Sequence, residues 1–152
     1  MKKGIQLVAV KLVALTAIIL LLQSIVPASA MADSMSLENI GKVSSKGVRH
    51  VNAAESLQII EIAPDVVILD VRTPIEYKRG HLENAVNINY YSFSFKKQIK
   101  ELDRDKTYLL HCHSGVRSGR SIPIMLAAGF KNIIHMDGGY KAWKDQGLPI
   151  SE

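Results

Sequence analysis

The single cysteine of the chain, Cys112, opens the segment with the clearest chemical potential, Cys-His-Ser-Gly-Val-Arg-Ser at residues 112–118. A loop of this length between a strand and a helix can turn its backbone N–H groups toward one point, and the helix N-terminus adds further donors. A thiolate at that point is stabilised relative to the thiol, and Arg117 and Arg120 act in the same direction. Such surroundings lower a cysteine pKa from about 8.5 to about 3.5–7.5. We therefore expect a nucleophile that needs no separate base; the alternative is an inert cysteine buried at a strand end.

The other residues around Cys112 have different expected roles. Gly115 can adopt the positive φ that directs loop N–H groups inward. Arg117 would attract an anionic substrate, and His113 is the second candidate for touching it. His111 is expected to point into the core, with its hydrogen bonds satisfied there. Because these two histidines and the cysteine lack ligand spacing on one face, we expect neither a metal site nor another cofactor.

The segments on either side of this loop alternate between strand and helix patterns. Aliphatic runs of strand length are typical of strands covered on both faces. Capping boxes of Asn52 with Glu55 and of Thr73 with Glu76 predict two helix starts, and this position fully explains Glu76. The predicted strands cover residues 48–51, 66–69, 85–88, 107–111 and 133–136, with helices between them and a last helix over 140–145. This order predicts an α/β fold with a parallel sheet and helices on both faces, and it places Cys112 at the carboxyl end of a strand, where such folds hold their sites.

Several short motifs occur in the order and spacing of a known family. They are Asp70-Val71-Arg72, Glu76-Tyr77, Gly80-His81-Leu82, Ala85-Val86-Asn87-Ile88, the loop from Cys112 to Ser118, Ala128-Gly129-Phe130 and the run from Gly138 to Trp143. On these residues the chain resembles the single-domain rhodaneses, which are sulfurtransferases. The resemblance covers about residues 48–149 and implies a rhodanese-like fold of three layers with a five-stranded parallel core.

The same resemblance implies a reaction through a persulfide of Cys112. A small anionic sulfur donor such as thiosulfate would load the cysteine, and a thiol or cyanide would accept the sulfur. The substrate-binding residues would be His113, Ser114, Gly115, Val116, Arg117 and Ser118. Asp70 and Arg72 would support the site architecturally rather than take part in the chemistry.

Three alternatives remain for the function. Cysteine phosphatases share the anion-binding loop but place five residues between cysteine and arginine, whereas this chain has four. A shorter loop suits one sulfur atom better than a phosphate group, which favours sulfur transfer. A persulfide-relay protein would pass the sulfur to a protein partner, and a silent binding domain would not need its cysteine.

Two residues depart from the family pattern. Asn84 stands where a glycine is common, in the turn before Ala85, and asparagine is the other residue that tolerates positive φ. Pro123 falls inside the helix that follows the loop, where proline removes a hydrogen bond. We therefore predict a kink or a tightened first turn in that helix.

The first 30 residues have the composition of an export signal. Lys2, Lys3 and Lys11 accompany an apolar run at residues 12–22, and the end at Ala28-Ser29-Ala30 fits signal-peptidase cleavage, as does a second motif ending at Ala32. Residues 12–32 carry no charge and are long enough to span a bilayer, so a retained anchor is the alternative. We expect a periplasmic or otherwise exported domain, tethered to the outer face of the inner membrane only if the leader is uncleaved.

Charge and composition narrow the function classes further. The net charge of +5 lies mostly in the leader, which holds three of the 19 basic residues and no acidic one. Residues 31–47 are polar and are interpreted as a linker, and residues 48–150 as the folded domain. Since that domain is nearly balanced in charge and lacks a basic-aromatic array, we expect no nucleic-acid partner.

Overall fold

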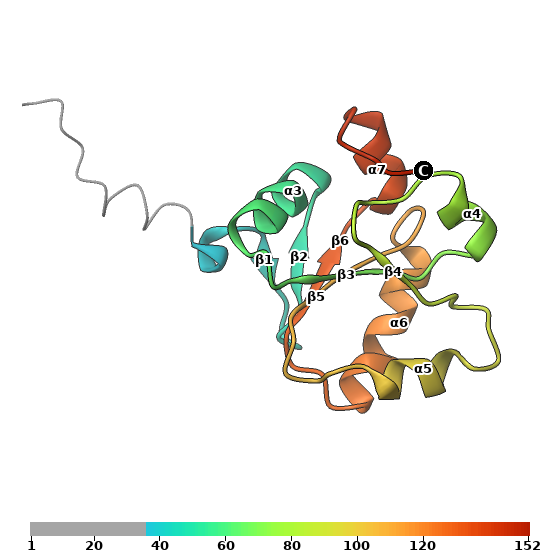
Figure 1. Ribbon diagram of the computed structural model, residues 1–152. Coiled ribbons are helices and arrows are strands. Elements are labelled where there is room, and N and C mark those ends of the chain that lie inside the picture. The colour runs from blue at the N-terminus through green and yellow to red at the C-terminus, as the bar shows by residue number, and fades with distance from the viewer. Residues whose placement is uncertain (1–35) are drawn as a thin grey trace, which may run out of the picture. The chain divides into compact units, whose positions relative to one another are not determined.

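Six strands form one sheet in the computed structural model, which describes residues 36–152 (Figure 1). The leader predicted at residues 1–30 lies outside the described residues. Along the sheet the strands follow the order β1-β2-β6-β5-β3-β4. Their bounds are β1 Lys42–Val43, β2 Arg49–Val51, β3 Val67–Asp70, β4 Val86–Asn87, β5 Tyr108–His111 and β6 Ile133–Met136. The strands β2 to β6 are parallel, and β1 adds an antiparallel edge, so the predicted α/β fold with a five-stranded parallel core is confirmed.

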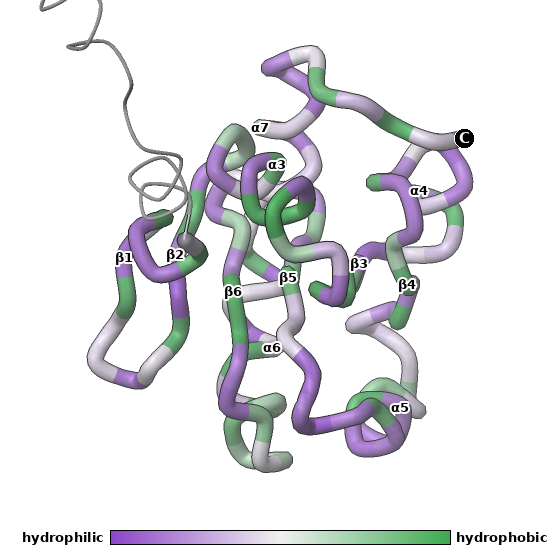
Figure 2. Tube along the Cα trace, turned by 60° about the vertical axis from the view of Figure 1, so that its left-hand side comes forward, coloured by the Kyte–Doolittle hydropathy of each residue, from purple (hydrophilic) through white to green (hydrophobic). Residues whose placement is uncertain are grey.

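Helices cover both faces of this sheet (Figure 1). Their bounds are α3 Ala53–Ile62, α4 Pro74–Lys78, α5 Phe95–Glu101, α6 Val116–Ala127 and α7 Gly139–Asp145, with a 3-10 turn at Leu37–Asn39. Alternate residues of the strands supply two separate cores, because successive side chains point to opposite faces. Leu110 packs with α5 and α6, whereas Leu109 packs with α3 and α7. Figure 2 shows β6, in the middle of the sheet, as largely hydrophobic.

Local signals fix two of the helix starts. Asn52 and Thr73 each accept a hydrogen bond from the backbone of the third helical residue, and the carboxylates of Glu55 and Glu76 each accept one from the backbone N–H of the cap residue. Both predicted capping boxes are therefore confirmed. Each box satisfies backbone donors that the helix itself cannot pair.

The structure differs from the sequence analysis at the start of the domain. Part of the segment interpreted as a linker forms the 3-10 turn and β1, which pairs with β2 through Lys42 opposite His50. A two-residue strand has no alternating pattern to reveal it, so the sequence gives no signal for this edge. The sheet therefore begins at Lys42, before the boundary expected at residue 48.

The two departures from the family pattern have different outcomes. Asn84 has a φ of 60°, as expected for a residue that takes the place of a glycine. Helix α6 runs as one helix from Val116 through Pro123 to Ala127. In its first turn Gly119 N donates to Gly115 O at 2.8 Å, which is an α-helical bond, so the prediction of a tightened first turn is wrong. Within residues 36–152, no helix is both long and apolar enough to cross a bilayer.

Candidate active site

Cys112 lies between the carboxyl end of β5 and the N-terminus of α6, and only 1% of its surface is exposed. Gly115 N donates a hydrogen bond to Sγ at 3.2 Å, and Ser118 Oγ donates another at 3.4 Å. Gly115 has a φ of 91°, a conformation that favours glycine and that turns the chain into the helix. The loop thus surrounds the sulfur with donors.

These donors decide the ionisation of the thiol. Burial raises the pKa of Cys112, but hydrogen bonds from the Ser118 hydroxyl and from the backbone N–H groups of Ser118, Ser114 and Gly115 lower it, and the net effect is a pKa below the ordinary value of a thiol. A hydrogen bond to the charged form of a group favours that form. The thiolate is therefore stabilised mainly by neutral donors of the loop.

Arg117 is engaged with a residue that the sequence analysis treated only as a helix cap. Its guanidinium forms two hydrogen bonds with Glu76, from Nη1 to Oε2 at 2.7 Å and from Nη2 to Oε1 at 2.6 Å. The pair lowers the pKa of Glu76 to about 2 and raises the pKa of Arg117. The interpretation of Glu76 as no more than a cap is therefore wrong, because it also binds Arg117 from α4.

The remaining loop residues face solvent. His113, Ser114 and Val116 are exposed, and so is Arg120 on the first turns of α6. The Arg117 guanidinium lies 5.7 Å from the ring centroid of Tyr91. The structure thus brings the predicted loop residues together around the Cys112 sulfur, with backbone donors directed inward and several side chains exposed.

Asp70 and Arg72 form a buried ion pair at the end of β3. Arg72 is 1% exposed and Asp70 is fully buried, and the Arg72 Nη2 lies 2.6 Å from Asp70 Oδ2. The same guanidinium donates to Gly80 O at 2.9 Å and lies 3.9 Å from the ring centroid of Tyr140. This pair joins β3, the end of α4 and the start of α7, which is a supporting position.

His111 is buried as expected, but its hydrogen bonding is incomplete. Its Nδ1 lies 3.3 Å from Cys112 O, and its Nε2 has no hydrogen-bond partner, although Asp70 Oδ2 is 3.9 Å away. Burial lowers the pKa of His111 more than Asp70 raises it. The expectation of a fully satisfied core histidine is therefore wrong at this nitrogen.

Helix α7 holds the outer side of the Cys112 loop. Tyr140 N donates to Cys112 O at 2.7 Å, and Lys141 N donates to His113 O at 2.8 Å. Gly139 makes this approach possible, because a Cβ there would lie 2.5 Å from Cys112 O and its φ is +59°. The Gly138-Gly139 pair therefore serves close packing against the site.

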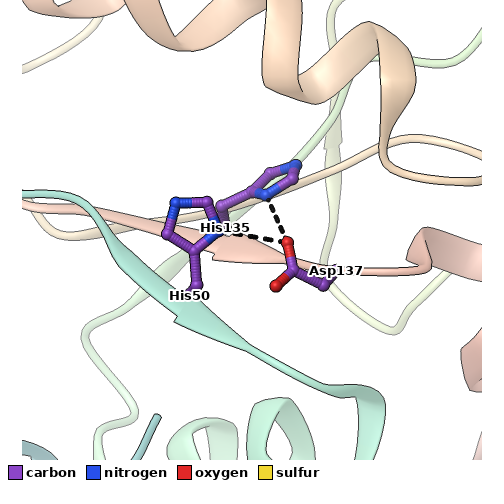
Figure 3. Close-up of side chains that lie close together, drawn as sticks. All are labelled: His50, His135 and Asp137. Carbon is purple, nitrogen blue, oxygen red and sulfur yellow. Dashed lines mark hydrogen bonds and ion pairs between the residues drawn. The ribbon is translucent and has the colours of Figure 1, made fainter. Parts of the chain in front are cut away.

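Three side chains near the site were missed by the sequence analysis. Ser118 Oγ lies 2.9 Å from His135 Nε2, and the Nδ1 atoms of His135 and His50 lie 2.9 and 3.1 Å from Asp137 Oδ1 (Figure 3). His135 lies on β6 and Asp137 directly follows this strand, two residues further on, and this spacing was the available signal in the sequence. His50 is distant in the sequence and joins them only through the pairing of β2 with β6. These three side chains are the ones whose donor atoms could hold a metal ion among the described residues.

A family model for the rhodanese-like domain matches residues 52–146, which is more than half of the chain. The chain belongs to the rhodanese-like family. The motifs that carried the resemblance, from the Asp70–Arg72 segment to Trp143, lie within this match.

Curated relatives share this domain but are longer proteins. The chain is 31% identical over 128 residues to a tRNA uridine(34) hydroxylase of Yersinia enterocolitica, and 32% identical to that of Yersinia pestis. These matches cover 78% of this chain and 34% and 33% of the two relatives. The chain therefore spans about a third of the length of these relatives.

Solved structures agree with the family. A rhodanese-related protein from Thermoplasma volcanium is 32% identical with a TM-score of 0.60, and the match covers 68% of this chain and 97% of that one. A rhodanese-like domain protein from Staphylococcus aureus is 27% identical with a TM-score of 0.58, covering 68% and 98%. The fold of this chain is thus that of rhodanese-like proteins.

Proposed function

We propose that this protein is a sulfurtransferase that carries a sulfane sulfur on Cys112. The observation that carries the proposal is the pair of donors on Sγ, from Gly115 N at 3.2 Å and Ser118 Oγ at 3.4 Å, in a loop of four residues between cysteine and arginine. Donors so placed stabilise a thiolate before the reaction and the terminal sulfur of a persulfide after it. Family membership supports the same chemistry.

The reaction has two displacement steps. In the first, the Cys112 thiolate attacks the outer sulfur of thiosulfate; the new S–S bond forms as the bond to the sulfite group breaks, and sulfite leaves with the electron pair. In the second, cyanide or a thiolate attacks the terminal sulfur, and the Cys112 thiolate departs. This covalent route divides one difficult transfer into two easier ones.

In this proposal Arg117 attracts an anionic donor less strongly than an unpaired cation would. Since Glu76 neutralises Arg117, an anionic donor would meet an ion pair rather than an unbalanced positive charge. The guanidinium side chain is 12% exposed, so any contact with the donor is made at the edge of the pair. Exposed His113 is the other side chain available to an anion there.

The test is turnover of thiosulfate and cyanide by the native protein and by Cys112→Ser, together with the intact mass after treatment with thiosulfate. We expect thiocyanate from the native protein alone and an adduct heavier by one sulfur atom, absent in Cys112→Ser. Sulfur transfer that persists in Cys112→Ser would overturn the mechanism. Hydrolysis of an aryl phosphate that depends on Cys112, without sulfur transfer, would replace it by the phosphatase alternative.

A persulfide relay to a protein partner is a second candidate, and one observation favours it. Large apolar side chains are exposed beside the Arg117–Glu76 pair, namely Ile75 at 64%, Tyr91 at 64% and Val116 at 57%, and Phe93, at 112%, follows Tyr91 by two residues. Exposed apolar groups around a site are typical of protein contacts. Formation of the adduct without turnover to cyanide would favour the relay.

This chain spans only about a third of the length of the Yersinia relatives, so we do not propose their hydroxylase activity for it.

For the location, we propose export, with the basic start and apolar run of residues 1–30 as support. The N-terminal residue of protein recovered from the cell envelope tests this. A start at residue 31 or 33 would support cleavage, a start at residue 1 would support a retained anchor, and recovery from the cytoplasm alone would refute export.

A further inference from the structure

Three side chains with metal-binding atoms converge beside the Cys112 loop, on the face of the sheet that α6 covers (Figure 3). His50 on β2 and His135 on β6 are direct partners in the parallel register, so their imidazoles stand side by side. Asp137 follows His135 by two residues and projects to the same face. One ligand atom from each residue lies within 4.8 Å of the other two.

The spacing of these atoms is close to that of a metal site. The Nδ1 atoms of His50 and His135 lie 3.1 and 2.9 Å from Asp137 Oδ1. Ligands bound tetrahedrally to zinc at about 2.0–2.1 Å lie about 3.3 Å apart. The two nitrogen–oxygen distances are thus within a few tenths of an ångström of the tetrahedral value, and the two nitrogens, which lie within 4.8 Å of one another, would move closer together to bind the same ion.

The surroundings of His135 fit a metal ligand. Its other ring nitrogen, Nε2, lies 2.9 Å from Ser118 Oγ, and the residue is 5% exposed, so the ring is fixed in orientation. A metal on Nδ1 leaves the proton on Nε2, and this N–H can donate a hydrogen bond to the Ser118 oxygen. Ligating histidines commonly use their second nitrogen in this way, and the contact fixes the tautomer.

The opposite side of the cluster is accessible. The side chains of His50 and Asp137 are 36% and 56% exposed, and a surface pocket lined by His50, Gly119 and Ile122 opens beside them. Water could therefore complete the coordination of an ion held by three protein ligands. Two imidazoles and one carboxylate are a donor set that suits zinc and its late first-row neighbours.

We propose that His50, His135 and Asp137 bind one divalent ion of the late first transition series. Each imidazole binds through Nδ1, and Asp137 provides a carboxylate oxygen. The site adjoins the Cys112 loop through Ser118 but does not include the thiol, and its test does not depend on sulfur transfer.

The test is a calorimetric titration of the metal-free, full-length Cys112→Ser protein with Zn²⁺, which removes the thiol as a competing ligand. We expect one ion per chain, and a loss of affinity of at least about 10-fold in His50→Gln and in Asp137→Asn. The Asn side chain still offers an oxygen to both imidazoles, so Asp137→Asn preserves the hydrogen bonds while removing the charge. His113→Gln removes an exposed imidazole outside the cluster and serves as the matched control, with unchanged affinity expected.

A second readout identifies the ligands directly. Addition of Zn²⁺ should shift the Nδ1 resonances of His50 and His135 in nitrogen NMR spectra and leave those of His113 in place. Thermal unfolding shows that each variant is folded. Absence of saturable binding in the parent protein would overturn the proposal, as would equal affinity in the parent, His50→Gln and Asp137→Asn.

Discussion

The ion pair between Arg117 and Glu76 makes a sharp prediction about stability. We consider Glu76→Gln, because glutamine keeps the size of the side chain and can still accept hydrogen bonds in the capping box with Thr73. The substitution removes the negative charge of the carboxylate, whose two oxygens accept hydrogen bonds from Arg117 at 2.6 and 2.7 Å. Charge-assisted, bidentate contacts of this kind are the strong ones among hydrogen bonds.

The magnitude follows from the pKa of Glu76, which is lowered from 4.5 to about 2. At 1.36 kcal/mol for each pKa unit, this shift corresponds to an upper limit of about 3 kcal/mol. The Glu76 side chain is 31% exposed, so solvent screens part of the interaction, and we expect a cost of about 1–2 kcal/mol in the free energy of unfolding. The Arg117 side chain, which is less exposed than that of Glu76, would stay in place without the carboxylate that neutralises it.

The sign of the pH dependence is fixed by the direction of the shift. A carboxyl whose pKa is lowered on folding contributes stability above its unfolded pKa, and that contribution is lost as the pH falls through its folded pKa. The native protein should therefore exceed Glu76→Gln in stability at pH 7, and the difference should shrink from about pH 4.5 toward pH 2. Urea unfolding of both proteins across this range measures the difference.

The matched control is Glu83→Gln, which removes an exposed carboxylate, for which we expect a change within about 0.5 kcal/mol. Two results would refute the reasoning. Equal stability of native protein and Glu76→Gln at pH 7 would show that the pair contributes nothing. A difference that stays constant down to pH 2 would show that the effect of the substitution does not come from the charge.

Two further predictions concern the thiol and the buried pair. Ser118→Ala removes a donor to Sγ, and since hydrogen bonds to charged groups contribute about 1.5–3 kcal/mol, the pKa of Cys112 should rise. The pH profile of Cys112 alkylation measures this shift, and Ser114→Ala, which keeps its backbone N–H, should leave the profile in place. Arg72→Met leaves the carboxylate of Asp70 buried without its partner and should lower the free energy of unfolding by about 3–5 kcal/mol. Urea unfolding checks it, and a loss below about 1 kcal/mol would contradict the view that this pair supports the site.

Most of the fold could be predicted because its signals are local. Aliphatic runs marked the central strands, and capping boxes marked the starts of α3 and α4 to the residue. The antiparallel strand β1 was missed because two residues, Lys42 and Val43, carry no periodicity. Its place depends on hydrogen bonds to β2, which a local pattern does not encode.

The site was predictable only in part, for a related reason. The loop that begins at Cys112 is continuous in the sequence, so its donors could be anticipated. The partners of its side chains come from elsewhere: Glu76 from α4 binds Arg117, and His135 from β6 contacts Ser118. The capping box already explains why a glutamate stands at position 76. The sequence therefore contains no local sign that Glu76 also binds Arg117.

The contact between α7 and the Cys112 loop determines which kind of ion the loop can attract. Tyr140 N and Lys141 N bind the carbonyl oxygens of Cys112 and His113, so the negative ends of these two peptide dipoles are turned away from the sulfur and neutralised. The inner surface of the loop is left with positive dipole ends, which repel cations and attract anions. The electrostatic polarity of the loop thus depends on a glycine pair more than twenty residues downstream, and a side chain at Gly139 would disturb this polarity as well as the packing.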